Sequence, residues 1–182
     1  MRDEERGAFR APRPFSVMDF KKQHIKTSVV ACIIDEQERV LLTRRCVAPF
    51  CGQWVMPGGK IDHGEPILAA LHREVREEVG LEVRVEGLID VFEHVRVGDE
   101  ADHFVILYYR AAPIGGVLQP NGGECTEAAW LPKERLPALD LPPGARHILS
   151  RIFPALLWPE TPATPAADCS PDEPLMCQVE EP

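Results

Sequence analysis

The chain has 182 residues and a net charge of −9, from 20 Lys and Arg against 29 Asp and Glu. This length suffices for one domain with a hydrophobic core, and the acidic balance argues against nucleic-acid binding, which needs a basic surface. No apolar run approaches the ~18 residues of a membrane span, and residues 1–6 lack the apolar core of a signal peptide. We therefore expect a cytoplasmic protein that binds neither nucleic acid nor membrane.

The N-terminal half of the chain begins with an extension and continues with strands. Residues 1–23 are charged and contain proline, and they can pack on the domain or on a partner subunit through Phe9, Phe15, Met18 and Phe20. Apolar, β-branched runs bounded by turn residues then predict strands. In chain order we expect a strand at 27–35, a turn at 36–39, a strand at 40–44, a short strand at 53–56 and a turn or loop at 57–59.

A helix is predicted next. Pro66 suits its first turn, where a missing N–H is tolerated, and Gly80 is well placed to end it. The apolar residues between them recur at helical spacing, at Ile67, Leu68, Leu71, Val75 and Val79. At about 100° per residue, Glu74 and Glu78 project within or beside this apolar arc, whereas Glu77 lies off its edge.

Glu74, Glu77 and Glu78 therefore form a crowded acidic cluster on one helix. Such charge runs are usually solvated surface, but half-buried acids without a fixed partner destabilise a fold. A hard divalent cation such as Mg²⁺, which prefers oxygen ligands, would remove that cost. Neutralisation by Arg73 and other basic residues is the structural alternative.

The C-terminal half alternates between strands and a last helix. We expect strands at 82–92, at 104–111, where the run is strongly apolar and central, and at 127–131, followed by a helix at 142–157 that is bent or broken near Pro154. From Pro159 the chain is rich in Pro, Ala, Asp and Glu, which predicts a disordered tail. The domain organisation is thus an extension (1–23), an α/β domain (24–158) and an acidic, Pro-rich tail (159–182).

The cysteines show no metal-binding or disulfide pattern. No C-x-x-C pair occurs, and no His lies at zinc-like spacing from another ligand. We expect free thiols in a reducing compartment at Cys32, Cys46, Cys51, Cys125, Cys169 and Cys177.

The segment from Gly59 to Leu81 follows the pattern G-x5-E-x7-R-E-V-x-E-E-x-G-L. It resembles the signature of the Nudix (MutT-type) hydrolase family, and it matches every fixed position: Gly59, Glu65, Arg73, Glu74, Val75, Glu77, Glu78, Gly80 and Leu81. The resemblance implies a Nudix-type α/β/α sandwich with a mixed, partly barrel-like sheet.

The resemblance also implies roles for the motif residues. Glu74 and Glu78 look like the principal ligands of Mg²⁺, with Mn²⁺ as a substitute, and Glu77 and the carbonyl of Gly59 look like further ligands. Arg73 looks like the residue that ties the loop to the helix through a bidentate guanidinium. Glu65 looks structural, at a helix start where negative charge is favourable.

The general base and the substrate contacts lie outside the motif. In the family the base often comes from a later loop, which makes Glu124 and Glu127 the first candidates, while a glutamate of the motif remains an option. Other acids in this region are Glu93, Asp99, Glu100 and Asp102. Arg44 and Arg45 end an apolar strand, where either can hold a phosphate or ribose group; for each residue a solvated surface role is the alternative.

The function implied is Mg²⁺-dependent hydrolysis of the diphosphate linkage in a small-molecule nucleotide substrate, a nucleoside diphosphate derivative such as ADP-ribose. The MutT-type alternative is a housecleaning (deoxy)nucleoside triphosphate pyrophosphohydrolase, and a third option is a nucleotide sensor without activity. Patterns that mark NADH or ADP-ribose hydrolysis are missing after the motif, so the sequence specifies no narrower substrate. Relatives are commonly homodimers, so a homodimer is one expectation.

Overall fold

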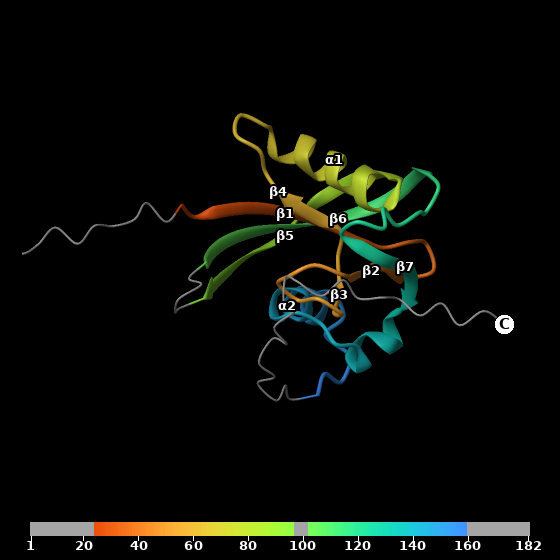
Figure 1. Cartoon of the computed structure of the whole chain (residues 1–182). Helices are drawn as coiled ribbons and strands as arrows, with labels where there is room; N and C mark the ends of the chain where they lie inside the picture. The colour runs from red at the N-terminus through yellow and green to blue at the C-terminus, as the bar shows by residue number, and fades with distance from the viewer. Residues whose placement is uncertain (1–23, 97–101, 160–182) are drawn as a thin grey trace, which may run out of the picture.

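The computed structural model describes residues 24–96 and 102–159, and every structural statement below refers to these residues. Seven strands, two α-helices and one 3-10 helix are formed there (Figure 1). In chain order they are β1 (Lys26–Ile33), β2 (Arg39–Arg45), β3 (Trp54–Val55), β4 (Gly58–Lys60), α1 (Ile67–Val79), β5 (Leu81–Arg96), β6 (Asp102–Gly116), β7 (Cys125–Pro132), η1 (Lys133–Ala138) and α2 (Pro143–Ile152).

The strands form two sheets. The first has the order β4-β1-β6-β5, in which β1 and β6 are parallel and the other pairs are antiparallel. The second is antiparallel, with the order β3-β2-β7. The first sheet is therefore mixed, as predicted, and the strand predicted at 104–111 lies inside it as part of β6.

Two apolar cores hold the helices against the sheets. On one face α1 buries Leu71, Val75 and Val79 against alternate residues of β1, including Val29 and Ile33. On the other face α2 and η1 pack over the second core through Leu136, Ile148 and Leu149. Helices thus cover both sides of the strands (Figure 1), and the predicted α/β sandwich is confirmed, although the sheet is not closed into a barrel.

The helix α1 is much shorter than the strands beneath it. Its 13 residues rise about 20 Å at 1.5 Å per residue, whereas the 16 residues of β5 extend for about 53 Å at 3.3 Å per residue. Since β5 starts directly after α1 and runs back below it, its second half passes beyond the start of the helix. Figure 1 shows these ends of β1, β5 and β6 projecting past α1.

Three sequence predictions are corrected by the structure. The expected loop at 57–59 is in part a strand, because Gly58–Lys60 pairs with residues 28–30 of β1 through backbone groups that the glycine-rich sequence does not reveal. Pro66 is the N-cap of α1 rather than a member of its first turn. The helix predicted at 142–157 ends at Ile152, so the break near Pro154 is confirmed, but residues 153–157 are not helical, since a residue that precedes proline disfavours the helical conformation.

Four of the six cysteines lie in the part of the chain that the structure describes. Cys32, Cys46, Cys51 and Cys125 are free thiols, whereas Cys169 and Cys177 lie outside the described ranges. In the part of the chain that the structure describes, no helix has the length and apolar character to span a membrane. The extension at 1–23 and almost all of the predicted tail also lie outside, so both stay predictions.

Candidate active site

The site is built where α1 packs against β4. The helix ends at Gly80, whose φ of 70° is left-handed and whose N–H bonds to the carbonyl of Arg76. Within residues 24–95 and 102–159, Glu78 is the only charged residue that is buried, with 6% of its surface exposed. Its Oε2 accepts a hydrogen bond from the backbone N–H of Gly58 at 2.9 Å. Burial nevertheless raises the pKa of Glu78 to about 7, because a low-dielectric environment disfavours the charged carboxylate.

Glu74 lies one turn before Glu78 and faces the same strand. Its side chain is 13% exposed, and burial is the main reason that its pKa is raised. A Cβ atom placed on Gly59 would lie 2.5 Å from the carboxylate carbon of Glu74. The backbone of β4 therefore approaches this carboxylate as closely as only glycine allows.

Arg73 joins the helix to the preceding loop. Its Nη1 donates to Glu74 Oε1 at 2.7 Å and to Glu77 Oε2 at 3.2 Å. Its Nε and Nη2 donate to the two oxygens of Glu65, each at 2.9 Å, and Nη2 also donates to the Lys60 carbonyl at 3.1 Å. The hydrogen bond from Arg73 lowers the pKa of Glu65. These bonds fix the loop between β4 and α1 against the acidic helix.

Glu124 and Arg45 are brought to the same acids. The negative charge of Glu124 contributes to the raised pKa of both Glu74 and Glu78, and the positive charge of Arg45 opposes the rise at Glu78. Arg45 is oriented by hydrogen bonds from its guanidinium to the carbonyls of Ala48 and Pro49. Thus one candidate base and one candidate phosphate ligand lie within electrostatic reach of the buried carboxylates.

The segment that carries Glu124 also caps α1. The N–H groups of Gln119 and Asn121 donate to the carbonyls of Val79 and Glu78, each at 3.0 Å. The side-chain Oδ1 of Asn121 then accepts from the N–H groups of Gly123 and Glu124 at 3.1 and 3.0 Å. Sequence reasoning missed this role of Asn121, and the only signal for it was the turn-forming Asn-Gly-Gly run.

The remaining candidates lie elsewhere. Arg44 and Glu127 are both exposed and face each other in the register of β2 and β7. Glu93 pairs with His103 at 2.7 Å, and Asp102 pairs with Lys26. Asp99 and Glu100 lie outside the described residues. None of these four described residues contributes to the pKa shifts of Glu74 and Glu78.

The donor atoms at β4 and α1 fit a divalent cation of the magnesium type. Among the described residues, no three His, Cys, Asp or Glu side chains converge as a complete metal site. Mg²⁺, however, usually binds proteins through one or two carboxylates and completes its shell with water and substrate phosphates. Glu74, Glu78 and the Gly59 carbonyl are hard oxygen donors of this kind, and Glu78 is a buried carboxylate that lacks a cationic hydrogen-bond partner.

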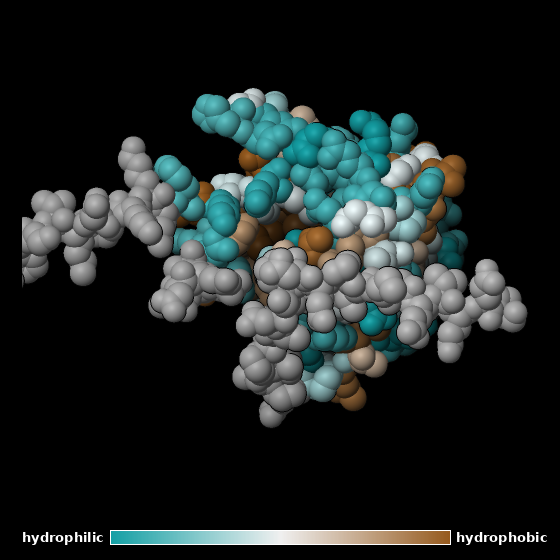
Figure 2. Space-filling model, in the orientation of Figure 1, coloured by the Kyte–Doolittle hydropathy of each residue, from teal (hydrophilic) through white to brown (hydrophobic). Residues whose placement is uncertain are grey.

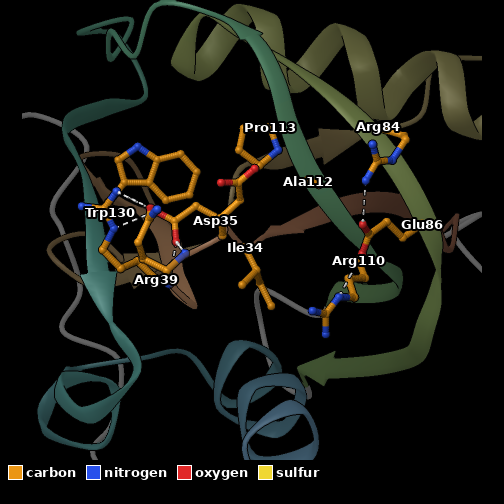
Figure 3. Close-up of a pocket in the computed structure, with 11 residues that line it drawn as sticks. Ile34, Asp35, Arg39, Arg84, Glu86, Arg110, Ala112, Pro113 and Trp130 are labelled. Carbon is orange, nitrogen blue, oxygen red and sulfur yellow. Dashed lines mark hydrogen bonds and ion pairs between the residues drawn. The ribbon is translucent and has the colours of Figure 1, made fainter.

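A separate pocket of about 520 Å³ opens at the carboxyl end of β1 (Figure 3). None of the motif residues lines it. Its arginines are already paired with carboxylates: Arg39 with Asp35 at 2.6 Å, and Arg84 and Arg110 with Glu86 at 3.2 and 3.0 Å. This pocket is therefore distinct from the acidic site.

The family model of the NUDIX domain matches residues 24–152. The crystal structure of a MutT NUDIX hydrolase from Burkholderia pseudomallei aligns with a TM-score of 0.65 and 29% identity, over 71% of this chain and 98% of that one. The family model covers most of the chain, and the aligned structure has the same fold, so together they define a NUDIX domain. More narrowly, the chain belongs to the Nudix family, as the sequence predicted.

Two curated relatives carry named activities. The human 8-oxo-dGDP phosphatase NUDT18 is 38% identical over 60% of this chain and 33% of its own length. An ADP-ribose pyrophosphatase from Methanocaldococcus jannaschii is 33% identical over 59% of this chain and 62% of its own length. The chain thus spans about a third of the human relative and less than two thirds of the archaeal one.

Proposed function

We propose that this chain hydrolyses the diphosphate linkage of a nucleoside diphosphate or its derivative with the aid of Mg²⁺, for which Mn²⁺ can substitute. The observation that carries the proposal is the burial of Glu78 beside Glu74, with a backbone N–H as its hydrogen-bond partner. Burying charged carboxylates costs folding free energy unless a cation neutralises them. This cost applies above all to Glu78, which is buried. Nudix hydrolases generally use divalent metal ions, which supports the assignment of these two carboxylates as metal ligands.

The cation would be held by Glu74, Glu78 and the Gly59 carbonyl, with Glu77 assisting, and it would neutralise phosphate charge and lower the pKa of a bound water. Arg73 keeps these donors in place by fixing the loop to the helix. We assign the role of general base to Glu124, whose negative charge contributes to the raised pKa of both Glu74 and Glu78. Glu124 then accepts the proton of the water that attacks phosphorus.

Arg45 is the candidate for holding the substrate phosphate. Its guanidinium lies close enough to Glu78 to lower the pKa of that carboxyl, and arginine suits phosphate because it is always charged and donates in a planar fork. Arg44 and Glu127, which pair across β2 and β7, remain weaker candidates for substrate binding and for the base. Phosphoryl-type transfer depends mainly on such positioning and charge stabilisation.

The names of the relatives support the substrate class. 8-oxo-dGDP and ADP-ribose each contain a diphosphate attached to a nucleoside, and the two proteins so named are 38% and 33% identical to this chain. The second candidate is a triphosphate pyrophosphohydrolase, which is supported by the MutT name of the Burkholderia structure. A nucleotide sensor without activity is less well supported, because every fixed motif position is present. A cytoplasmic location and a homodimer also remain proposals.

A substrate panel tests this function. The purified chain would be incubated with Mg²⁺ and 8-oxo-dGDP, ADP-ribose, 8-oxo-dGTP or unmodified nucleotides, and phosphate and mononucleotide release would be measured. We expect one diphosphate compound to be preferred, and the Glu78→Gln variant to lose at least about a hundredfold in turnover, as for other electrostatic catalytic groups. The control, Glu36→Gln, replaces an exposed acid and should be fully active. Preference for a triphosphate would support the second candidate, and equal activity of Glu78→Gln and the wild type would refute the site.

A further inference from the structure

Six large apolar side chains are exposed around the part of the first sheet that α1 leaves uncovered. Each has between 40% and 57% of its surface exposed. They come from β5, from the first turn of α1 and from the residue before β1, and we refer to them as the apolar patch: Ile25, Ile67, Leu68, Leu88, Val91 and Val95. Exposed apolar side chains that gather at one end of a sheet are typical of an interaction site.

The strand register places the β5 members of the patch on the side of the sheet that faces α1. Leu88 lies opposite Tyr109, and Val91 lies opposite Leu107. Tyr109 packs against the core that α1 covers, and alternate residues of a strand share a face. The same alternation along β1 places Ile25 on the side of the buried Val29. Figure 2 shows the outer surface of α1 as hydrophilic, with hydrophobic residues below it where the helix meets the strands.

The patch exists because of the length mismatch between α1 and the strands. The helix begins at Ile67, and Ile67 and Leu68 of its first turn remain 40% and 44% exposed. Among the described residues, no other element packs over this end of β5 and β6 on the α1 side. The folded domain thus presents an apolar face that requires an additional segment.

We propose that residues 9–20 of this same chain pack on the apolar patch. Within these twelve residues the sequence has five large apolar side chains, Phe9, Phe15, Val17, Met18 and Phe20. The segment enters the domain at His24 and Ile25, and Ile25 is itself a member of the patch. The proposal rests on this juxtaposition of an apolar segment and an apolar face, and it does not depend on the proposed activity.

The connection is long enough for the segment to reach the whole patch. Leu88 and Val95 are seven residues apart, or about 23 Å along a strand. Phe9 and Ile25 are sixteen residues apart, so the chain between them can extend for about 50 Å. A tethered segment also binds at an effective concentration in the millimolar range, which favours it over a second copy of the chain.

The segment would therefore contact the helix that carries the acidic cluster. Ile67 and Leu68 belong to the first turn of α1, and Glu74 and Glu78 lie two and three turns further along it. Packing of residues 9–20 would fix the beginning of this helix from outside, while Arg73 fixes it from the loop side.

Limited proteolysis of the full chain tests the proposal. Trypsin can cleave after Arg10, Lys21 and Lys22, and mass spectrometry identifies each product. Replacing Val91 and Val95 by Asp should accelerate cleavage at these sites about tenfold, since proteolysis follows the population of the undocked state. The matched control is Ile114→Asp, which alters a residue of β6 that is 60% exposed but lies outside the patch; its cleavage should equal that of the wild type.

A second set of variants guards against general unfolding. Replacing Phe15 and Phe20 by Ser changes no residue of the described domain and should accelerate cleavage by the same factor. Combining these changes with the Asp variants should add nothing, because both sets remove the same interaction. Equal cleavage of the wild type and the Asp variants would overturn the proposal. Protection that grows with protein concentration, together with dimers in sedimentation, would also overturn it and assign the patch to a second copy.

Discussion

Two arginine–carboxylate clusters in this molecule use the same chemical groups in different surroundings. In the first, Arg73 has a side chain that is 29% exposed and binds acids of which Glu74 is nearly buried. In the second, Arg84 and Arg110 are 67% and 49% exposed, and they share Glu86. In the second cluster two exposed arginines share one carboxylate, and exposed pairs of this kind contribute little to stability.

The first cluster has more carboxylates than arginines. Arg73 donates hydrogen bonds to Glu65, Glu74 and Glu77. Glu78 is buried instead, and it accepts a hydrogen bond from the backbone N–H of Gly58. The comparison teaches that the number of ion pairs does not identify the functional site. The residue on which the proposed site rests is Glu78, the buried acid to which no hydrogen bond from Arg73 is formed.

The largest effect should appear at Glu78 in the absence of divalent cations. The folded-state pKa of about 7 lies above the ordinary value of 4.5, so between these pH values the folded protein keeps a proton that the unfolded chain has lost. Wild-type stability should therefore fall as pH rises through this window, by up to about 3 kcal/mol. Glu78→Gln carries no titrating group and should lack this component. Urea unfolding in EDTA at several pH values measures the difference, and parallel curves for the two proteins would contradict it.

Replacing arginine should distinguish the two clusters directly. Arg73→Ala removes five hydrogen bonds from the guanidinium to the loop and the helix, and we expect a loss of about 2 kcal/mol in unfolding free energy together with most of the turnover. Arg84→Ala removes one exposed pair and should change stability by less than about 0.5 kcal/mol. Chemical denaturation and a turnover assay on both variants provide the measurement. Similar losses in the two would remove the distinction between the clusters.

The smallest of these effects should come from one methyl group in the first cluster. In Gly59→Ala the new Cβ would lie 2.5 Å from the Glu74 carboxylate, so the flexible acid must move and we expect about a tenfold loss of turnover, or 1.4 kcal/mol. Gly123→Ala has no atom within 4 Å of its Cβ and should remain active. Thermal unfolding would show that both variants are folded, and full activity of Gly59→Ala would mean that the position of Glu74 is not critical.

The sequence contained the local part of this site. Helical periodicity predicted that Glu74 and Glu78 turn inward and that Glu77 turns outward, and the structure has Glu78 buried and Glu77 58% exposed. The strands β1, β2 and β7 were predicted within a few residues, because their buried β-branched and apolar residues follow strand patterns.

The long-range part of the site was not contained in local patterns. That Gly58 donates its N–H to Glu78 depends on the pairing of β4 with β1, and glycines give no strand signal. The choice between Glu124 and Glu127 depends on how β7 enters its sheet, where a register shift between Arg44 and Arg45 alters the alternation. Local propensity predicts neither this hydrogen bond nor the positions of Glu124 and Glu127, because these features arise from contacts between segments distant in the chain.

The cap that residues 119–121 form on α1 has a consequence for how the chain tolerates changes in length. Because Asn121 holds the Glu78 carbonyl with its N–H and the Glu124 turn with its side chain, the spacing between the helix end and β7 is set by two anchor points. An insertion here would displace Glu124 from the carboxylates even if every side chain of the site were kept. Variants with a longer loop in this segment should therefore fold but lose turnover.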